Sequence, residues 1–182
     1  MGSERGADDG PATAEDRLAA LESRLAATQT RLAELEDERD IRDLLAKYSF
    51  GADLYRGRPW VDLWTDDGVY DLGDQNLPDA YTGTFQGPER LLELITGPNM
   101  PPAGRSQHHV HGPLIVEVVG DEATAEGYSV TFVRHGDTTG IWTVGFSRWT
   151  FRRVDGRWRI HRRERRELGS PDQTDVIRQP VA

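Results

Sequence analysis

The sequence predicts an α+β domain in which helices come first and cover one face of a strongly curved antiparallel sheet, with a coiled-coil helix ahead of them. Hydrophobic residues recur every three or four positions through residues 14–52, and every second position after residue 105. Turn signals such as Gly120-Asp121 and Asp155-Gly156 separate the alternating segments. Because connections this short join antiparallel neighbours, the second half of the chain is predicted to be a meander.

The N-terminal region predicts a tail followed by a coiled coil. Residues 1–13 are small, polar and glycine-rich, so we expect a disordered tail. From Ala14 the spacing alternates between three and four, as in an a/d seam, and Arg39 takes the next seam position, so a coiled-coil helix is predicted over residues 14–38. Since a leucine stripe needs a partner, we expect a homodimer or homotrimer; the alternative is a helix folded back on its own domain. The seam residues are Leu18, Leu21, Leu25, Thr28, Leu32 and Leu35.

The globular domain is predicted to span residues 39–168, with residues 169–182 as a C-terminal arm. Its first helix carries a broader apolar stripe, which suits packing on a sheet. A short helix is expected after Pro59, a short strand at 69–72 and a helix at 87–95 with Pro88 in its first turn. The four long strands are predicted at residues 106–119, 122–134, 141–154 and 157–167.

Composition limits the function. The net charge of −9 disfavours nucleic acid as a partner, and the Arg-rich run at 162–166 is interrupted by Glu164, which indicates a salt-bridged sheet face. The sequence has no cysteine, which excludes disulfides and thiolate chemistry and fits a reducing compartment. No apolar run is long enough for a signal peptide or a membrane span. We therefore expect a cytoplasmic protein without a membrane partner.

Three of the five histidines lie at the start of the strand predicted at 106–119, and they are the densest supply of proton-transfer groups in the chain. Alternation puts His108 on the same face as Val110, and His109 and His111 on the other. We expect His108 to face the cavity and its two neighbours to lie at an interface; a bulged strand would invert this. A metal site using His109 and His111 is an alternative, without an identifiable third ligand.

Several motifs, taken in order, resemble one family. They are Ile41 to Tyr48, Asp53, Trp60 to Asp71, Phe85 to Glu89, His108 before a valine-rich strand, Gly120 to Ala125 and Asp155 to Ile160. Together they resemble the SnoaL-like family of the nuclear transport factor two-like superfamily, which includes scytalone dehydratase and hexachlorocyclohexane dehydrochlorinase. The resemblance covers roughly residues 39–168. It implies a sheet curled into a half-open cone, with a cavity closed by the first helices.

The resemblance also implies a catalytic pair, which matches Asp53 and His108 here, with Tyr48 as a polar pocket residue. A carboxylate that accepts a hydrogen bond from an imidazole fixes its tautomer and makes it a better-defined base. Relatives commonly have asparagine four positions after the histidine, where this chain has Gly112. The resemblance therefore does not identify a particular substrate for this chain.

The expected function is that of a cofactor-independent lyase or isomerase, namely a dehydratase, dehydrohalogenase or cyclase acting on a small cyclic or polyketide-like molecule. The alternative is a non-catalytic ligand-binding or oligomeric assembly module of the same fold. Aromatic residues of the sheet are expected to line an apolar pocket, with Arg162 at its mouth unless it forms an ion pair with Glu164. The expected substrate-binding residues are Tyr128, Phe132, Trp142, Phe146 and Arg162.

Overall fold

The computed structural model describes residues 13–73, 82–97 and 106–173. The chain divides into two compact units, residues 1–37 and 38–182. The predicted tail, apart from Thr13, and the last nine residues of the predicted C-terminal arm lie outside the described residues.

The first element, α1, is a single helix from Ala14 to Asp53. It begins at a capping box, in which the backbone N–H of Asp16 donates to Thr13 Oγ1 at 3.1 Å and the backbone N–H of Thr13 donates to Asp16 Oδ2 at 2.9 Å. Thr13, expected to end the tail, therefore caps the helix. The shift of the apolar stripe near Ile41 occurs without a break in α1.

The remaining helices are short and begin where proline predicts. Helix α2 spans Arg58–Val61 and α3 spans Gly87–Thr96, each with a proline in its first turn. The strands within the described residues are β1 (Trp64–Asp71), β2 (Thr84–Gln86), β3 (Ser106–His111), β4 (Ile115–Val119), β5 (Glu122–His135), β6 (Thr138–Val154) and β7 (Arg157–Glu167).

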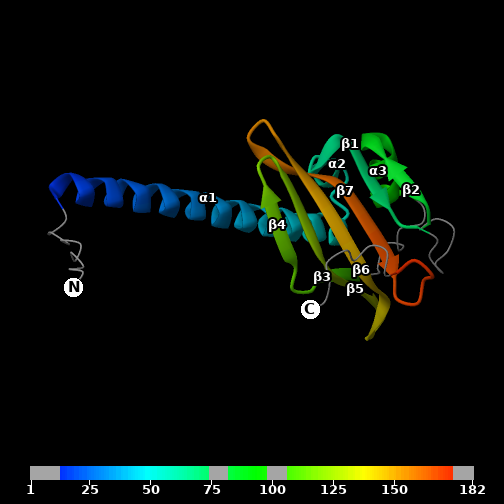
Figure 1. Ribbon diagram of the computed structural model, residues 1–182. Coiled ribbons are helices and arrows are strands. Elements are labelled where there is room, and N and C mark those ends of the chain that lie inside the picture. Colours follow the sequence, from blue (N-terminus) through cyan, green and yellow to red (C-terminus); the bar gives the residue numbers. More distant parts are fainter. Residues whose placement is uncertain (1–12, 74–81, 98–105, 174–182) are drawn as a thin grey trace. The chain divides into compact units, whose positions relative to one another are not determined.

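These strands form one curved sheet that does not close on itself, in the order β2-β1-β7-β6-β5-β3, with β4 also paired to β5 (Figure 1). The predicted α+β class is confirmed, but the sheet is not wholly antiparallel, because β1 runs parallel to β7. The single strand predicted at 106–119 is two strands, both antiparallel to β5. Pro113 lies between them, and proline has no N–H for a ladder hydrogen bond.

Two bulges, one between β5 and β6 and one between β6 and β7, reset the side-chain alternation of these strands. Between β5 and β6, Thr131 pairs with Thr143 but Phe132 pairs with Ile141, so the register skips one residue of β6. Between β6 and β7, Thr150 pairs with Arg162 but Phe151 pairs with Ile160. A bulge moves every later side chain of its strand to the opposite face relative to simple alternation. The residues that the ladder register skips are Trp142 and His161.

The core lies between the sheet and the helical segments that cover one of its faces (Figure 1). From α1 it takes the apolar stripe of residues 41–52, as predicted, and from α2 it takes Trp60. From the sheet it takes large side chains of β6 and β7, which are almost fully buried. The core residues of β6 and β7 are Trp149, Phe151, Trp158 and Ile160.

Gly145 in β6 allows a close approach of β7. A Cβ at this position would lie 2.3 Å from the carbonyl oxygen of Arg166, which is backbone and cannot swing aside. We expect Gly145→Ala to lower the free energy of unfolding by ~1–3 kcal/mol, as overpacking does. Gly140→Ala, in the same strand with nothing within 4 Å, is the control. Urea denaturation checks this; equal midpoints for the two variants would contradict it.

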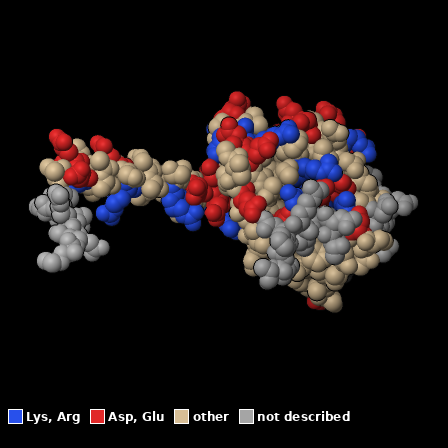
Figure 2. Space-filling model, viewed as in Figure 1, with Lys and Arg blue, Asp and Glu red and all other residues tan. Residues whose placement is uncertain are grey.

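The surface carries charges of both signs. Figure 2 shows acidic and basic side chains interspersed over this face of the larger unit. None of the helices in the described ranges is both long and apolar enough to cross a bilayer.

Candidate functional site

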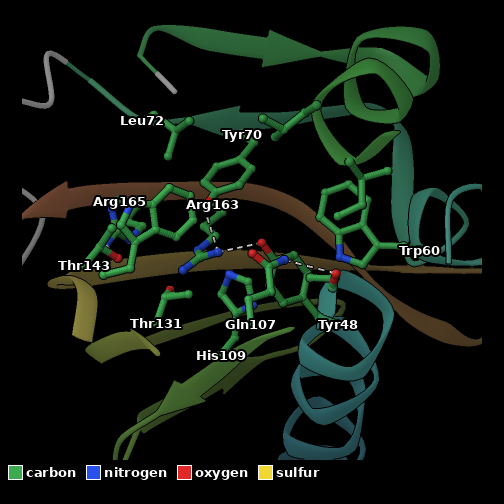
Figure 3. A pocket seen from close by; sticks show the side chains of 14 residues that line it. Tyr48, Trp60, Tyr70, Leu72, Gln107, His109, Thr131, Thr143, Arg163 and Arg165 are labelled. Atoms are coloured by element: carbon green, nitrogen blue, oxygen red, sulfur yellow. Dashed lines mark hydrogen bonds between the residues drawn. The ribbon is translucent and has the colours of Figure 1, made fainter. Parts of the chain in front are cut away.

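A pocket opens between the end of α1, β1, α3 and the inner face of the sheet (Figure 3). It contains about 590 Å³ not filled by protein atoms, including its open mouth. Its wall combines aromatic and aliphatic side chains with an unusual number of polar ones. The polar lining residues are Tyr48, Tyr70, Gln107, His109, Thr131, Thr143, Arg163 and Arg165, and the apolar ones include Ala52, Trp60, Leu72, Ile95 and Trp142.

The last residue of α1, Asp53, clamps His109 of β3. Its Oδ1 lies 2.6 Å from His109 Nδ1, and its two carboxylate oxygens accept from the backbone N–H of His109 at 3.0 and 3.1 Å. The Asp53 side chain is 9% exposed and that of His109 is 18% exposed. The carboxylate therefore fixes the proton on Nδ1 and leaves Nε2, which bonds no described residue, as the basic nitrogen of a pocket histidine.

The prediction that His108 faces the cavity is wrong. Its side chain is 81% exposed, it is absent from the pocket wall, and its Nδ1 lies 3.5 Å from Asp53 Oδ2. The strand is regular, so no bulge inverts it. The prediction took the apolar face of β3 as the inner one, whereas Val110 is 46% exposed and the inner face carries Gln107 and His109. His109, assigned to an interface, holds the position expected of His108.

Tyr48 lies in the pocket wall, as predicted, and its hydroxyl is held by a buried cation. The guanidinium of Arg163, which is 1% exposed, donates to Tyr48 Oη at 2.5 Å, to Tyr70 Oη at 2.8 Å and to Ser147 Oγ at 3.1 Å. Its Cζ lies 4.3 Å from the ring centroid of Trp149. Among the described residues no carboxylate forms an ion pair with Arg163, and its Nε has no hydrogen-bond partner.

Burial sets the protonation states at this site. It lowers the pKa of His109 below the usual 6.5, while the hydrogen bond and charge of Asp53 act in the opposite direction. Burial also lowers the pKa of His111, which lies two residues further along β3, to about 2. It raises the pKa of Tyr48 above its usual value of 10.0, although the charge of Arg163 opposes this. At neutral pH the pocket therefore holds a neutral imidazole base, a protonated phenol and a guanidinium cation.

Arg163 was missed because a bulge cannot be read from the sequence. Simple alternation places Arg162 on the same face as Ile160. The extra residue His161 shifts the alternation of side chains by one position, so Arg163 and Arg165 point inward instead. Arg162 does not line the pocket; it forms ion pairs with Asp71 at 2.7 Å and Glu164 at 3.5 Å. The ion-pair alternative holds for this residue.

The predicted aromatic wall is only partly present. Trp142, the bulged residue of β6, lines the pocket. Tyr128, Phe132 and Phe146 do not: Tyr128 is 58% exposed, and its ring packs at a tilt against that of Phe146, with the ring centroids 4.9 Å apart, on the other face of the sheet. The reason is again the alternation of the strand: in this part of β5 the buried residues are Ser129 and Thr131, so Tyr128 and Phe132 lie on the other face. Aromatic content alone does not mark the inner face.

Gln107 supplies a further polar group that sequence reasoning did not single out. Its Nε2 donates to the carbonyl oxygen of Ala52 at 3.3 Å, while its buried Oε1 has no hydrogen-bond partner. This acceptor is available to a ligand hydroxyl or a water. The described residues contain no group of three or more side chains that could hold a metal ion, and His111 of the suggested metal pair has both ring nitrogens buried without partners.

The profile of the SnoaL-like domain matches residues 33–164. The chain belongs to the SnoaL-like family. This SnoaL-like domain is also similar to a solved NTF2-like protein with a cystatin-like fold from Novosphingobium aromaticivorans, at 34% identity and a TM-score of 0.74, over 85% of this chain and 97% of that one. The recognised resemblance and the fold class are thereby confirmed.

Two more distant structures show the fold alone. A putative aromatic ring hydroxylase from Novosphingobium aromaticivorans is 22% identical, with a TM-score of 0.59 over 75% of this chain and 92% of that one. ActVI-ORFA from Streptomyces coelicolor is 12% identical, with a TM-score of 0.63 over 73% and 98%. No curated protein sequence matches the chain.

Proposed function

We propose that this SnoaL-like domain is a cofactor-independent lyase or isomerase in which His109, held by Asp53, removes a proton next to a carbonyl group of a small cyclic substrate. The observation that carries the proposal is the 2.6 Å contact between Asp53 and His109 at the wall of a pocket that also contains Arg163. A non-catalytic module of this fold would have no need for a clamped, neutral imidazole in its cavity.

The base is His109 Nε2. Because Asp53 accepts the Nδ1 proton, the lone pair of the ring lies on the nitrogen that is left for the pocket. After proton transfer the imidazolium is stabilised by the same carboxylate, which stays ionised. A positioned general base of this kind supplies about 10²- to 10⁴-fold of rate acceleration.

The charge that develops on the carbonyl oxygen is stabilised by Arg163 and Tyr48. Figure 3 shows these side chains and His109 around the same space, from β7, α1 and β3. Arg163 is already oriented by two phenols and a serine, so it does not reorganise during the reaction. In this mechanism the Tyr48 proton, retained because burial raises its pKa, is directed at the enolate oxygen.

The reaction class follows from what leaves after the proton. Loss of hydroxide or halide from the neighbouring carbon gives dehydration or dehydrohalogenation, attack of the enolate on a second carbonyl gives cyclisation, and return of the proton elsewhere gives isomerisation. Each needs the same base and the same oxyanion site. The aromatic rings of Trp60, Tyr70 and Trp142 suit a flat or cyclic substrate.

Proton exchange tests this function before the substrate is known. A panel of cyclic ketones, including 2-tetralone, is incubated with the protein in D₂O, and the loss of α-protons is followed by NMR. We expect faster exchange than the buffer background for at least one compound, and loss of the acceleration in His109→Gln. If the wild-type protein accelerates exchange of none, or His109→Gln exchanges equally fast, the proposed function is wrong.

The pH profile of this exchange has an acid limb at low pH. His109 must be neutral to act as a base, and its pKa lies below 6.5 because it is buried, so activity is retained at pH 6.5 and lost only at lower pH. In Asp53→Asn the limb moves further to acid, because the carboxylate raises the pKa of His109. Exchange rates measured across the acid range check both expectations; a limb above pH 6.5 in the wild type would contradict them.

A further inference from the structure

The smaller unit carries an apolar stripe that remains open in the single chain. Five leucines of α1, spaced three, four or seven residues apart, are about half exposed or more. Exposed leucines aligned along one side of a helix mark an interaction surface. The exposed fractions of these residues are 58% (Leu18), 59% (Leu21), 59% (Leu25), 54% (Leu32) and 47% (Leu35).

The one polar residue of the stripe fits an apolar seam. Thr28 takes the position between Leu25 and Leu32, and its hydroxyl donates to the backbone carbonyl oxygen of Arg24 at 2.8 Å. The donor is therefore satisfied within the helix, and the methyl group is left for the seam. Thr28 does not require water on this face.

The charges beside the stripe identify the occupant and its direction. With Leu18 at heptad position a, the g positions hold Arg17, Arg24 and Arg31, and the e positions hold Glu22, Gln29 and Glu36. In a parallel coiled coil each g residue faces the e residue five positions later in the partner, so arginine meets glutamate, glutamine and glutamate in turn. In an antiparallel coiled coil g faces g, and arginine would meet arginine throughout.

We propose that residues 14–38 bind a second copy of this chain as a parallel, in-register coiled coil. The stripe supplies the apolar seam, and Arg17 and Arg31 pair with the partner's Glu22 and Glu36, twice over by symmetry. In the single chain Arg31 contacts Glu34 of the same helix at 3.0 Å with both side chains exposed, and this contact exchanges readily for the intermolecular one. The assignment is independent of the chemistry in the pocket.

Cysteine cross-linking tests the direction, since the chain has no cysteine of its own. Ala14→Cys introduces a thiol at a d position at the beginning of the seam without removing a leucine, and Ala20→Cys places a control thiol at a c position on the far side of the helix. Under mild oxidation of the full-length protein we expect a disulfide-linked dimer for Ala14→Cys and little for Ala20→Cys. Equal yields, or none for Ala14→Cys, would overturn the parallel arrangement.

Charge exchange in the Ala14→Cys background tests the pairing. The double variant Glu22→Arg/Glu36→Arg carries arginine at the first and last e positions as well as at the g positions. The double variant Arg17→Glu/Arg31→Glu carries glutamate at the first and last positions of both sets. We expect each variant alone to lose most of the cross-linked dimer, and an equimolar mixture, with one variant carrying an affinity tag, to recover it as the mixed dimer. Cross-linking of each variant at the wild-type level would show that these charges do not select the partner.

Discussion

Replacing His109 by glutamine is expected to reduce the proton-transfer rate by about 10²- to 10⁴-fold, because the positioned base is lost. His108→Gln is the matched control: the two histidines are adjacent, but the His108 side chain is 81% exposed and does not line the pocket. We expect it to retain nearly the wild-type rate. The measurement is the exchange rate of the best compound of the ketone panel under saturating conditions.

The opposite order of the two exchange rates would contradict the assignment of His109 as the base. If His108→Gln lost activity and His109→Gln kept it, β3 would present its other face to the substrate. Asp53→Asn provides a second check, since an amide can still accept a hydrogen bond from Nδ1 but cannot stabilise the imidazolium by charge. It is expected to lower the rate while leaving the fold intact.

Replacing Arg163 by methionine is expected to lower kcat by ~10²- to 10³-fold, the usual effect of removing one oxyanion donor. KM should change much less, because the interaction with the oxygen strengthens only as charge develops. Arg163→Lys keeps the charge but loses the planar set of donors that reaches Tyr48, Tyr70 and Ser147, so we expect a partial loss.

The control for this second prediction is Arg162→Met. Arg162 is the neighbouring arginine on the outer face, where it pairs with Asp71. Circular dichroism and urea denaturation of all three variants separate a folding defect from a catalytic one. An unchanged kcat with a raised KM for Arg163→Met would show that Arg163 only binds the ground state, contrary to the proposed role.

The elements of the fold could largely be predicted, because they depend on local patterns. The 3.6 period of α1, prolines in the first turns of α2 and α3, and the glycine turns between β5, β6 and β7 are all visible in the sequence. The parallel pairing of β1 with β7 could not be predicted in this way. It joins residues about a hundred positions apart, and no turn fixes their direction.

The residue types of the candidate site and the segments that carry them could be predicted from the sequence. The face of each strand that lines the pocket could not. Asp53 and Tyr48 follow from the buried stripe of α1 and from the family resemblance. The wrong histidine was chosen because the inner face of β3 is the polar one, contrary to the usual rule that the apolar face is buried. Arg163 was missed because the bulge at His161 reverses the alternation, and a single inserted residue has no sequence signal.

The state of the His109 ring is the most direct test of the account, and it needs no substrate. Long-range ¹H–¹⁵N spectra of the histidine rings, recorded across pH for the wild type and for His109→Gln, report which nitrogen carries the proton and at what pH the ring gains a second one. The resonances lost in His109→Gln should belong to a neutral ring protonated on Nδ1, with a pKa below 6.5. A ring protonated on Nε2, or one already charged at pH 6.5, would contradict the assignment of His109 as the base.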